Sequence, residues 1–126
     1  MRVARWILAS AIVLAACAPA AIVPDHAPDI VGTITSVQAP PTPEGRTRVR
    51  IEANPAEESG SPKMVLAVDR ETRILDASGG GEMRRVGVEA LRVGDRVRAW
   101  VTGPIMESYP SQGTAGTIVV GEAAAR

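Results

Sequence analysis

The sequence predicts an all-β domain: a small barrel of five to six short strands with one short helical turn. Two observations support this prediction. From Asp29 onward, apolar and polar residues alternate with a period of two in several short runs, as is typical of half-buried strands. Clusters of Pro and Gly separate these runs and predict turns between them. The barrel is expected to span residues 30–120.

The first three strands follow one another closely. Residues 30–37 are rich in β-branched side chains, and residues 47–53 alternate apolar with charged side chains. The segment 39–46, which contains three prolines and Gly45, predicts the turn between them. A third strand is expected at 64–68, after a polar loop.

The second half of the domain predicts shorter and less regular elements. Residues 72–75 form either an extension of the third strand or a fourth one, and 79–81 are a glycine turn. Only 88–91 favours a helical turn, and 96–102 and 114–120 predict the last two strands. Three apolar side chains near the turn are expected to close one end of the barrel: Val88, Leu91 and Val93.

This order, with a brief helical segment before the last two strands, is the pattern of an OB-like barrel. Closing the sheet into a barrel also removes the exposed edges that an open sheet would present. A domain of this size is large enough to fold unaided, although with modest stability.

The N-terminus predicts a secretory signal peptide at residues 1–16. Arg2 and Arg5 precede an apolar run and small residues, and no acid occurs before Cys17. Residues 14–17, Leu-Ala-Ala-Cys, resemble the lipobox of bacterial lipoproteins, which implies a lipid anchor on Cys17. Two alternatives remain open: ordinary cleavage after Ala20, and a retained membrane anchor.

The segment 17–29, three of whose residues are proline, predicts a flexible linker between lipid and barrel. His26 lies between two aspartates in this segment. We expect a solvated histidine there rather than a metal site, because ligands on a proline-rich linker are not preorganised. The last residues, 121–126, are expected to be a disordered tail. The sequence predicts no metal site and no cofactor.

Composition argues against several function classes. The chain has 14 basic and 14 acidic residues, and only two Trp, one Tyr and no Phe. Nucleic-acid binding is not expected, because it needs several stacking aromatics and a positive field. A catalytic triad would have to use His26, the only histidine, and Cys17 is the only cysteine. We therefore expect no enzyme, although a small hydrolytic site at Ser108 stays a weaker alternative.

Residues 103–112 stand out, because they bring together an acid, a hydroxyl, a phenol and an amide in one segment with two prolines. We expect this segment to be a loop, and loops on rigid scaffolds often bind ligands. The alternative is structural: Tyr109 caps the barrel and Pro110 fixes the turn. The candidate binding residues, with the strand that leads into the segment, are Arg98, Trp100, Glu107, Ser108, Tyr109 and Gln112.

The run from Gly94 and Asp95 to Trp100, followed by Gly-Pro-Ile at 103–105 and Glu-Ser-Tyr-Pro-Ser-Gln at 107–112, resembles the YobA-like family of small bacterial lipoprotein domains. The resemblance covers about residues 29–120. It implies an OB-like barrel and a lipid anchor, and no activity, since that family is a domain of unknown function.

Together these patterns predict a cell-envelope lipoprotein that presents a non-catalytic binding module. The lipid on Cys17 would hold it at the periplasmic face of a membrane in a Gram-negative host, or at the cell surface in a Gram-positive one. An envelope protein, a glycan or a small ligand is the expected partner. The alternative is an accessory structural subunit of an envelope complex. The sequence indicates no oligomeric state.

Overall fold

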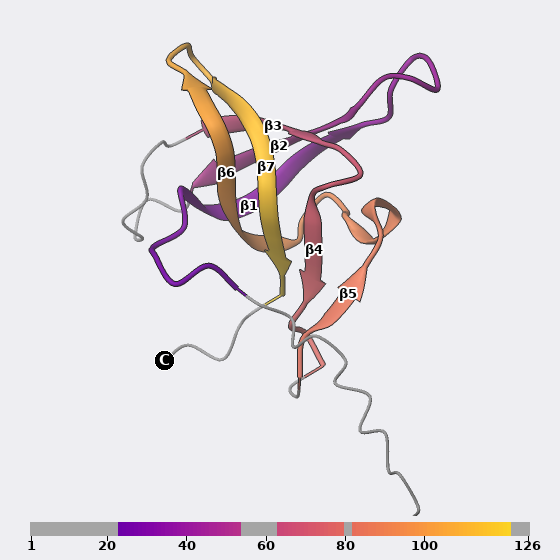
Figure 1. Ribbon diagram of the computed structural model, residues 1–126, viewed down its shortest axis with the longest axis vertical. Coiled ribbons are helices and arrows are strands. Elements are labelled where there is room, and N and C mark those ends of the chain that lie inside the picture. Colours follow the sequence, from indigo (N-terminus) through magenta and orange to yellow (C-terminus); the bar gives the residue numbers. More distant parts are fainter. Residues whose placement is uncertain (1–22, 54–62, 80–81, 122–126) are drawn as a thin grey trace, which may run out of the picture.

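The computed structural model describes residues 23–53, 63–79 and 82–121, and these form a nearly all-β molecule (Figure 1). The predicted fold class is confirmed: the chain forms a closed five-stranded barrel, two further strands and one 3-10 turn. The predicted signal peptide, Cys17 and most of the tail lie outside the described residues. Within the described ranges, no helix has the length and hydrophobicity to cross a membrane.

Five strands build the barrel. They are β1 (Ile30–Gln38), β2 (Thr47–Ala53), β3 (Lys63–Val68), β6 (Arg96–Met106) and β7 (Ser111–Val120). Neighbours pair in the order β3-β2-β1-β6-β7, and a parallel pairing of β3 with β7 closes the ring. This is the Greek-key order of an OB-type barrel. In a ring of five, β6 lies opposite β2 and β3.

The inside of the barrel is filled by aliphatic side chains, as the alternation in the sequence predicts. Val49 and Ile51 of β2 are fully buried, whereas Arg48, one position before Val49, is exposed. One connected core results, made of Ile30, Ile34, Val49, Ile51, Met64, Leu66, Val68, Ile74, Leu91, Val97, Ala99, Ala115, Ile118 and Val120. Burial of apolar surface is the main force available to this domain.

Two strands extend the sheet beyond the barrel. β4 (Arg73–Asp76) runs parallel to the second half of β7, and β5 (Arg84–Val86) pairs antiparallel with β4. β4 agrees with one of the two predicted options for 72–75. β5 was not predicted, because three residues with two adjacent arginines show no alternation.

The helical turn η1 (Val88–Ala90) sits where the sequence predicts it, but it closes the barrel with only one side chain. Leu91 is buried, while Val88 is 37% exposed and Val93 65% exposed. The expectation that all three plug the barrel end is therefore wrong for the two valines. A 3-10 turn of three residues is too short to present more than one face to the core.

A second, smaller core lies on the outside of the barrel. Leu75, Trp100 and Val119 are buried there, and Val23, Ala77 and Met83 pack against them. The described part of the predicted linker, residues 23–29, thus follows the outer wall of the barrel (indigo in Figure 1). Packing contacts of the domain begin before Ile30.

Candidate functional site

The segment 103–112 is a protruding hairpin rather than a free loop (Figure 1). β6 continues to Met106 and β7 begins at Ser111, so only 107–110 form the tip. Gly103 has a positive φ of 77°, and the Tyr109–Pro110 peptide bond is cis. The hairpin register shifts twice along β6 and β7, which is consistent with the irregular sequence.

Polar groups in the tip serve the turn itself. The Ser108 hydroxyl donates to the Pro110 carbonyl at 2.7 Å, and the Ser108 amide donates to the Met106 carbonyl at 3.0 Å. The Ser111 hydroxyl donates to the Ser108 carbonyl at 3.4 Å. These bonds fix the tip, so its shape is set before any ligand arrives.

Apolar side chains of the tip and of the end of β6 beside it face solvent. Tyr109 is 75% exposed, Met106 63% and Ile105 40%. The Tyr109 ring has the Lys63 ammonium 5.7 Å from its centroid, a cation–π contact between the tip and the start of β3. Tyr109 therefore does not cap the barrel interior, which was the structural alternative.

The outer surface of β2 and β3 lies beside this tip. Arg50 is paired in register with Val65, and Glu52 with Lys63, so these side chains share the outward side. Gln112 of β7 is in register with Val65 on the other flank. We name this surface the binding face. It consists of Arg48, Arg50, Lys63, Val65, Tyr109 and Gln112.

The binding face is positively charged. It holds three cations, and the acids beside it are Glu52, which lies 3.4 Å from the Lys63 ammonium, and Glu107 of the hairpin tip. The pKa of Glu52 is lowered, first by a hydrogen bond from the Thr35 hydroxyl and then by Lys63. The Nε of Arg50 is buried without a hydrogen-bond partner in the described structure.

Trp100 and Arg98 lie away from this face. Trp100 is only 3% exposed, and its indole N–H donates to the His26 carbonyl at 2.9 Å. Arg98 lies 5.7 Å from the Trp100 ring. The expectation that the two residues share an exposed face with Arg48 and Arg50 is corrected by these positions, since β6 is opposite β2. Glu107, Ser108, Tyr109 and Gln112 are the predicted site residues that stay together.

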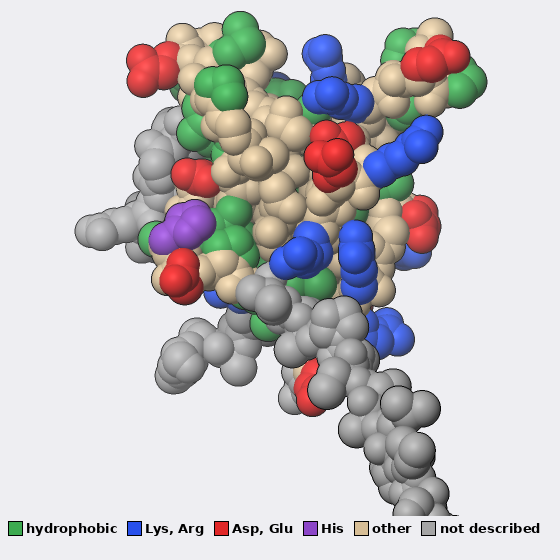
Figure 2. All heavy atoms as spheres, in the orientation of Figure 1, with side chains coloured by type: hydrophobic (Ala, Val, Ile, Leu, Met, Phe, Trp, Pro, Cys, Tyr) green, Lys and Arg blue, Asp and Glu red, His purple; other side chains and the backbone are tan. Residues whose placement is uncertain are grey.

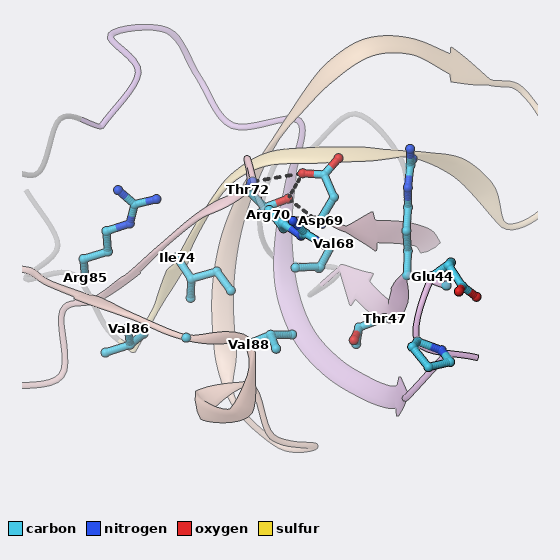
Figure 3. Close-up of a pocket in the computed structure, with 14 residues that line it drawn as sticks. Glu44, Thr47, Val68, Asp69, Arg70, Thr72, Ile74, Arg85, Val86 and Val88 are labelled. Carbon is cyan, nitrogen blue, oxygen red and sulfur yellow. Dashed lines mark hydrogen bonds between the residues drawn. The ribbon is translucent and has the colours of Figure 1, made fainter. Parts of the chain in front are cut away.

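A partly enclosed pocket lies at the other end of β2 (Figure 3). It has a volume of about 550 Å³ and is lined by the 43–47 turn, the turn after β3, and the β5–η1 segment. Figure 3 shows Ile74, Val86 and Val88 on one side of it and Glu44 and Thr47 on the other. The sequence does not indicate this pocket, because the pocket forms only when β5 folds against the barrel end.

One of the two acids that line the pocket, Asp69, stabilises the turn after β3. One Asp69 carboxylate oxygen accepts hydrogen bonds from the Glu71 amide at 2.9 Å and from the Thr72 amide at 3.0 Å. The Thr72 hydroxyl donates to the Ala115 carbonyl at 2.7 Å. These bonds tie the β3–β4 turn to β7, so both side chains act in the fold.

Clusters suited to a metal are not found in the described ranges: no three His, Cys, Asp or Glu side chains come together there. His26 lies 3.8 Å from Asp25, and both side chains are well exposed. This agrees with a solvated histidine beside the barrel.

Comparison with known families adds one match. The family described as "Protein of unknown function (DUF3221)" matches residues 57–120, just over half of the chain. The chain belongs to this family. No curated protein and no solved structure matches it.

The DUF3221 match ends at Val120, the last residue of β7, and includes β3 to β7. Lys63, Tyr109 and Gln112 of the binding face fall inside the matched region, whereas Arg48 and Arg50 precede it. The DUF3221 region thus contains the hairpin tip and both strands that border it.

Proposed function

We propose that this chain is a YobA-like bacterial envelope lipoprotein whose barrel is a non-catalytic module for binding an acidic glycan or similar anionic polymer. The lipid would be carried by Cys17, which lies outside the described residues, and the polymer would lie on the binding face. The lipoprotein part is supported by the signal pattern of residues 1–16 and by the lipobox at 14–17.

One observation supports the binding part above the others: the row of cations on the outer side of β2 and β3. In OB barrels, this face and the two loops that flank it bind extended ligands such as oligosaccharides. Arg48 and Arg50 are two positions apart on one strand, so about 7 Å separates them along β2. Successive anionic groups of a polymer can therefore each meet one guanidinium.

The hairpin tip completes this arrangement. Guanidinium groups bind carboxylates and phosphates through paired N–H donors. The exposed Tyr109 ring beside Lys63 offers a flat apolar surface against which a sugar ring can pack. Val65 lies between Arg50 and Gln112 in the strand register, so an apolar position separates them on this face. Charge and shape together favour an extended acidic ligand.

A non-catalytic role is supported by how the polar side chains of the described residues are used. Ser108 is engaged in the hairpin turn, and Asp69 and Thr72 hold the β3–β4 turn. General acid–base chemistry needs a titratable group within hydrogen-bond reach of a reacting atom. The binding face offers cations, an amide and a phenol for binding.

The anchor is tested by mass spectrometry of the protein purified from its native envelope. We expect a mature N-terminus at Cys17 with the added mass of two or three acyl chains. An unmodified N-terminus beyond Cys17 would replace the anchored module with a freely secreted one.

The binding face is tested by calorimetric titration with polygalacturonate, as a carboxylate polymer, and with polyphosphate. For the double variant Arg48→Gln/Arg50→Gln we expect Kd to rise by at least about 10-fold, because two charge-assisted contacts are lost. The control is Arg85→Gln/Arg92→Gln, which removes the same number of positive charges away from the binding face. Its Kd should stay within about 2-fold of that of the unsubstituted protein, because salt screens charges at that distance from the ligand. An equal loss of affinity in both double variants would mean that the polymer responds only to the net charge of the protein and not to the binding face.

A second candidate, an accessory subunit of an envelope complex, is favoured by the exposed apolar tip. Ile105, Met106 and Tyr109 account for three of the five large exposed apolar side chains in the described ranges. Clustered apolar side chains on a protruding element commonly mark protein contacts. If neither polymer binds and a crosslinker placed at the tip captures an envelope protein, this second function holds.

A further inference from the structure

The outer wall formed by β1, β6, β7, β4 and β5 presents a second surface, opposite the binding face. Strand register places its outward side chains: Val31 is paired with Arg98, Arg98 with Val119, and Leu75 with both Val119 and Arg85. The small outer core of Leu75, Trp100 and Val119 lies at its centre. We name this surface the strap face, because residues 23–29 cross it.

Residues 23–29, the strap, are tied to this surface by apolar packing and by hydrogen bonds. Val23 packs on the outer core. The His26 carbonyl accepts the Trp100 indole N–H at 2.9 Å, and the Asp29 carboxylate accepts the Val101 amide at 2.7 Å. The chain toward Cys17 therefore leaves the barrel from the strap face.

The distance from this exit to the predicted lipid is short. Cys17 and Val23 are six residues apart, so the chain between them can span at most about 20 Å. A barrel held on this tether by a membrane-inserted lipid would keep the strap face turned toward the bilayer.

Basic residues surround the outer core on this face. Figure 2 shows Lys and Arg side chains over the β4–β5 region, and Arg85 of β5 is exposed and in register with Leu75 of the outer core. The outward strand positions of the face hold no acid. They hold four arginines: Arg73, Arg85, Arg96 and Arg98.

Asp76 at the end of β4 is paired with Arg84 at 3.9 Å, and three further acids lie in the segments that cover the strap face. The Asp29 carboxylate is engaged by the Val101 amide, and Asp25 lies beside His26. Glu82 precedes β5 and is exposed. The arginines on the strands thus outnumber these three acids, one of which is already hydrogen-bonded.

We propose that the strap face is a membrane-contact surface that binds anionic phospholipid headgroups beside the lipidated Cys17. This inference rests on the proposed lipid anchor and deepens it. Each Lys or Arg near an anionic bilayer strengthens attachment by about five-fold, and the attraction acts only within about 10 Å. A tether of at most about 20 Å allows the arginines to come within that range, with the binding face directed away from the membrane.

The test is chemical footprinting of arginines in the acylated protein. The protein is reconstituted in vesicles of phosphatidylcholine, or of phosphatidylcholine with one third phosphatidylglycerol. It is then treated with phenylglyoxal, and modified arginines are mapped by peptide mass spectrometry. We expect Arg85 and Arg98 to react at least about 5-fold more slowly on the anionic vesicles than on the neutral ones. Arg48 and Arg50, on the opposite face, are the internal control and should react equally on both.

The outcomes separate the two proposals. Absence of acyl mass on Cys17 removes the anchor and this inference with it. If the acyl mass is present and Arg85 and Arg98 react equally on both vesicles, the anchor stands and the headgroup contact is wrong. Slower reaction of Arg48 and Arg50 on the anionic vesicles would instead mean that the binding face is turned to the bilayer, which also overturns the inference.

Discussion

Replacing Trp100 with Ala is expected to lower the free energy of unfolding by about 3–5 kcal/mol, since truncation of a buried tryptophan leaves a large cavity. The ring is 3% exposed and packs with Leu75 and Val119 outside the barrel. The change also removes the donor to the His26 carbonyl, so the strap loses one of its hydrogen bonds to the barrel.

The measurement is urea unfolding followed by circular dichroism, because Trp100 is the only tryptophan beyond the predicted signal peptide. Trp100→Phe is the control: it keeps an aromatic ring and loses the hydrogen bond, at an expected cost of about 1 kcal/mol for that bond, in addition to packing loss. A cost below about 1 kcal/mol for Trp100→Ala would contradict the structure, because exposed sites show changes of that size.

Trp100 also shows what the sequence pattern could and could not predict. Alternation in β6 correctly places it on the outer side of the barrel, opposite the inward Val97 and Ala99. Alternation does not say whether a second layer covers that outer side. The covering segment, residues 23–29, has no periodicity of its own, so its contact with a residue more than 70 positions away is a tertiary effect.

For the same reason, the sequence predicts some residues of the candidate site and not others. The sequence predicts one group of site residues within six positions of the chain: Glu107, Ser108, Tyr109 and Gln112. Lys63 was not predicted, although its ammonium lies 5.7 Å from the Tyr109 ring. That contact requires the β3–β7 pairing that closes the barrel, and parallel pairings between distant segments leave no local signature.

Barrel geometry links the two proposals. The ring order places β6 opposite β2 and β3, so the strap face and the binding face point in opposite directions. A protein tethered on one side and cationic on the other can hold an anionic polymer of the envelope without competition from the headgroups beneath it. The arginines of the two faces then contact different anions, which is why matched pairs from opposite faces serve as controls for each other.

Replacing Gly32 with Ala is expected to destabilise the domain by about 3 kcal/mol, at the upper end of typical overpacking costs. Gly32 lies in β1 and is in register with Ala53 of β2. A Cβ at this position would overlap the Glu52 carbonyl oxygen and lie 2.6 Å from its carbon and 2.8 Å from the Ala53 Cα. These atoms belong to the backbone, so no side-chain rotation relieves the contact.

Gly79→Ala is the matched control, because a Cβ there meets no atom within 4 Å. We expect its free energy of unfolding, measured in urea, to change by less than about 0.5 kcal/mol, as is usual at open surface positions. The β1–β2 contact at Gly32 also positions β2, the strand that carries Arg48 and Arg50 of the binding face. Gly32→Ala should therefore weaken polymer binding at temperatures where it is still folded. If Gly32→Ala were as stable as Gly79→Ala, β1 and β2 could not approach each other as closely as this barrel requires.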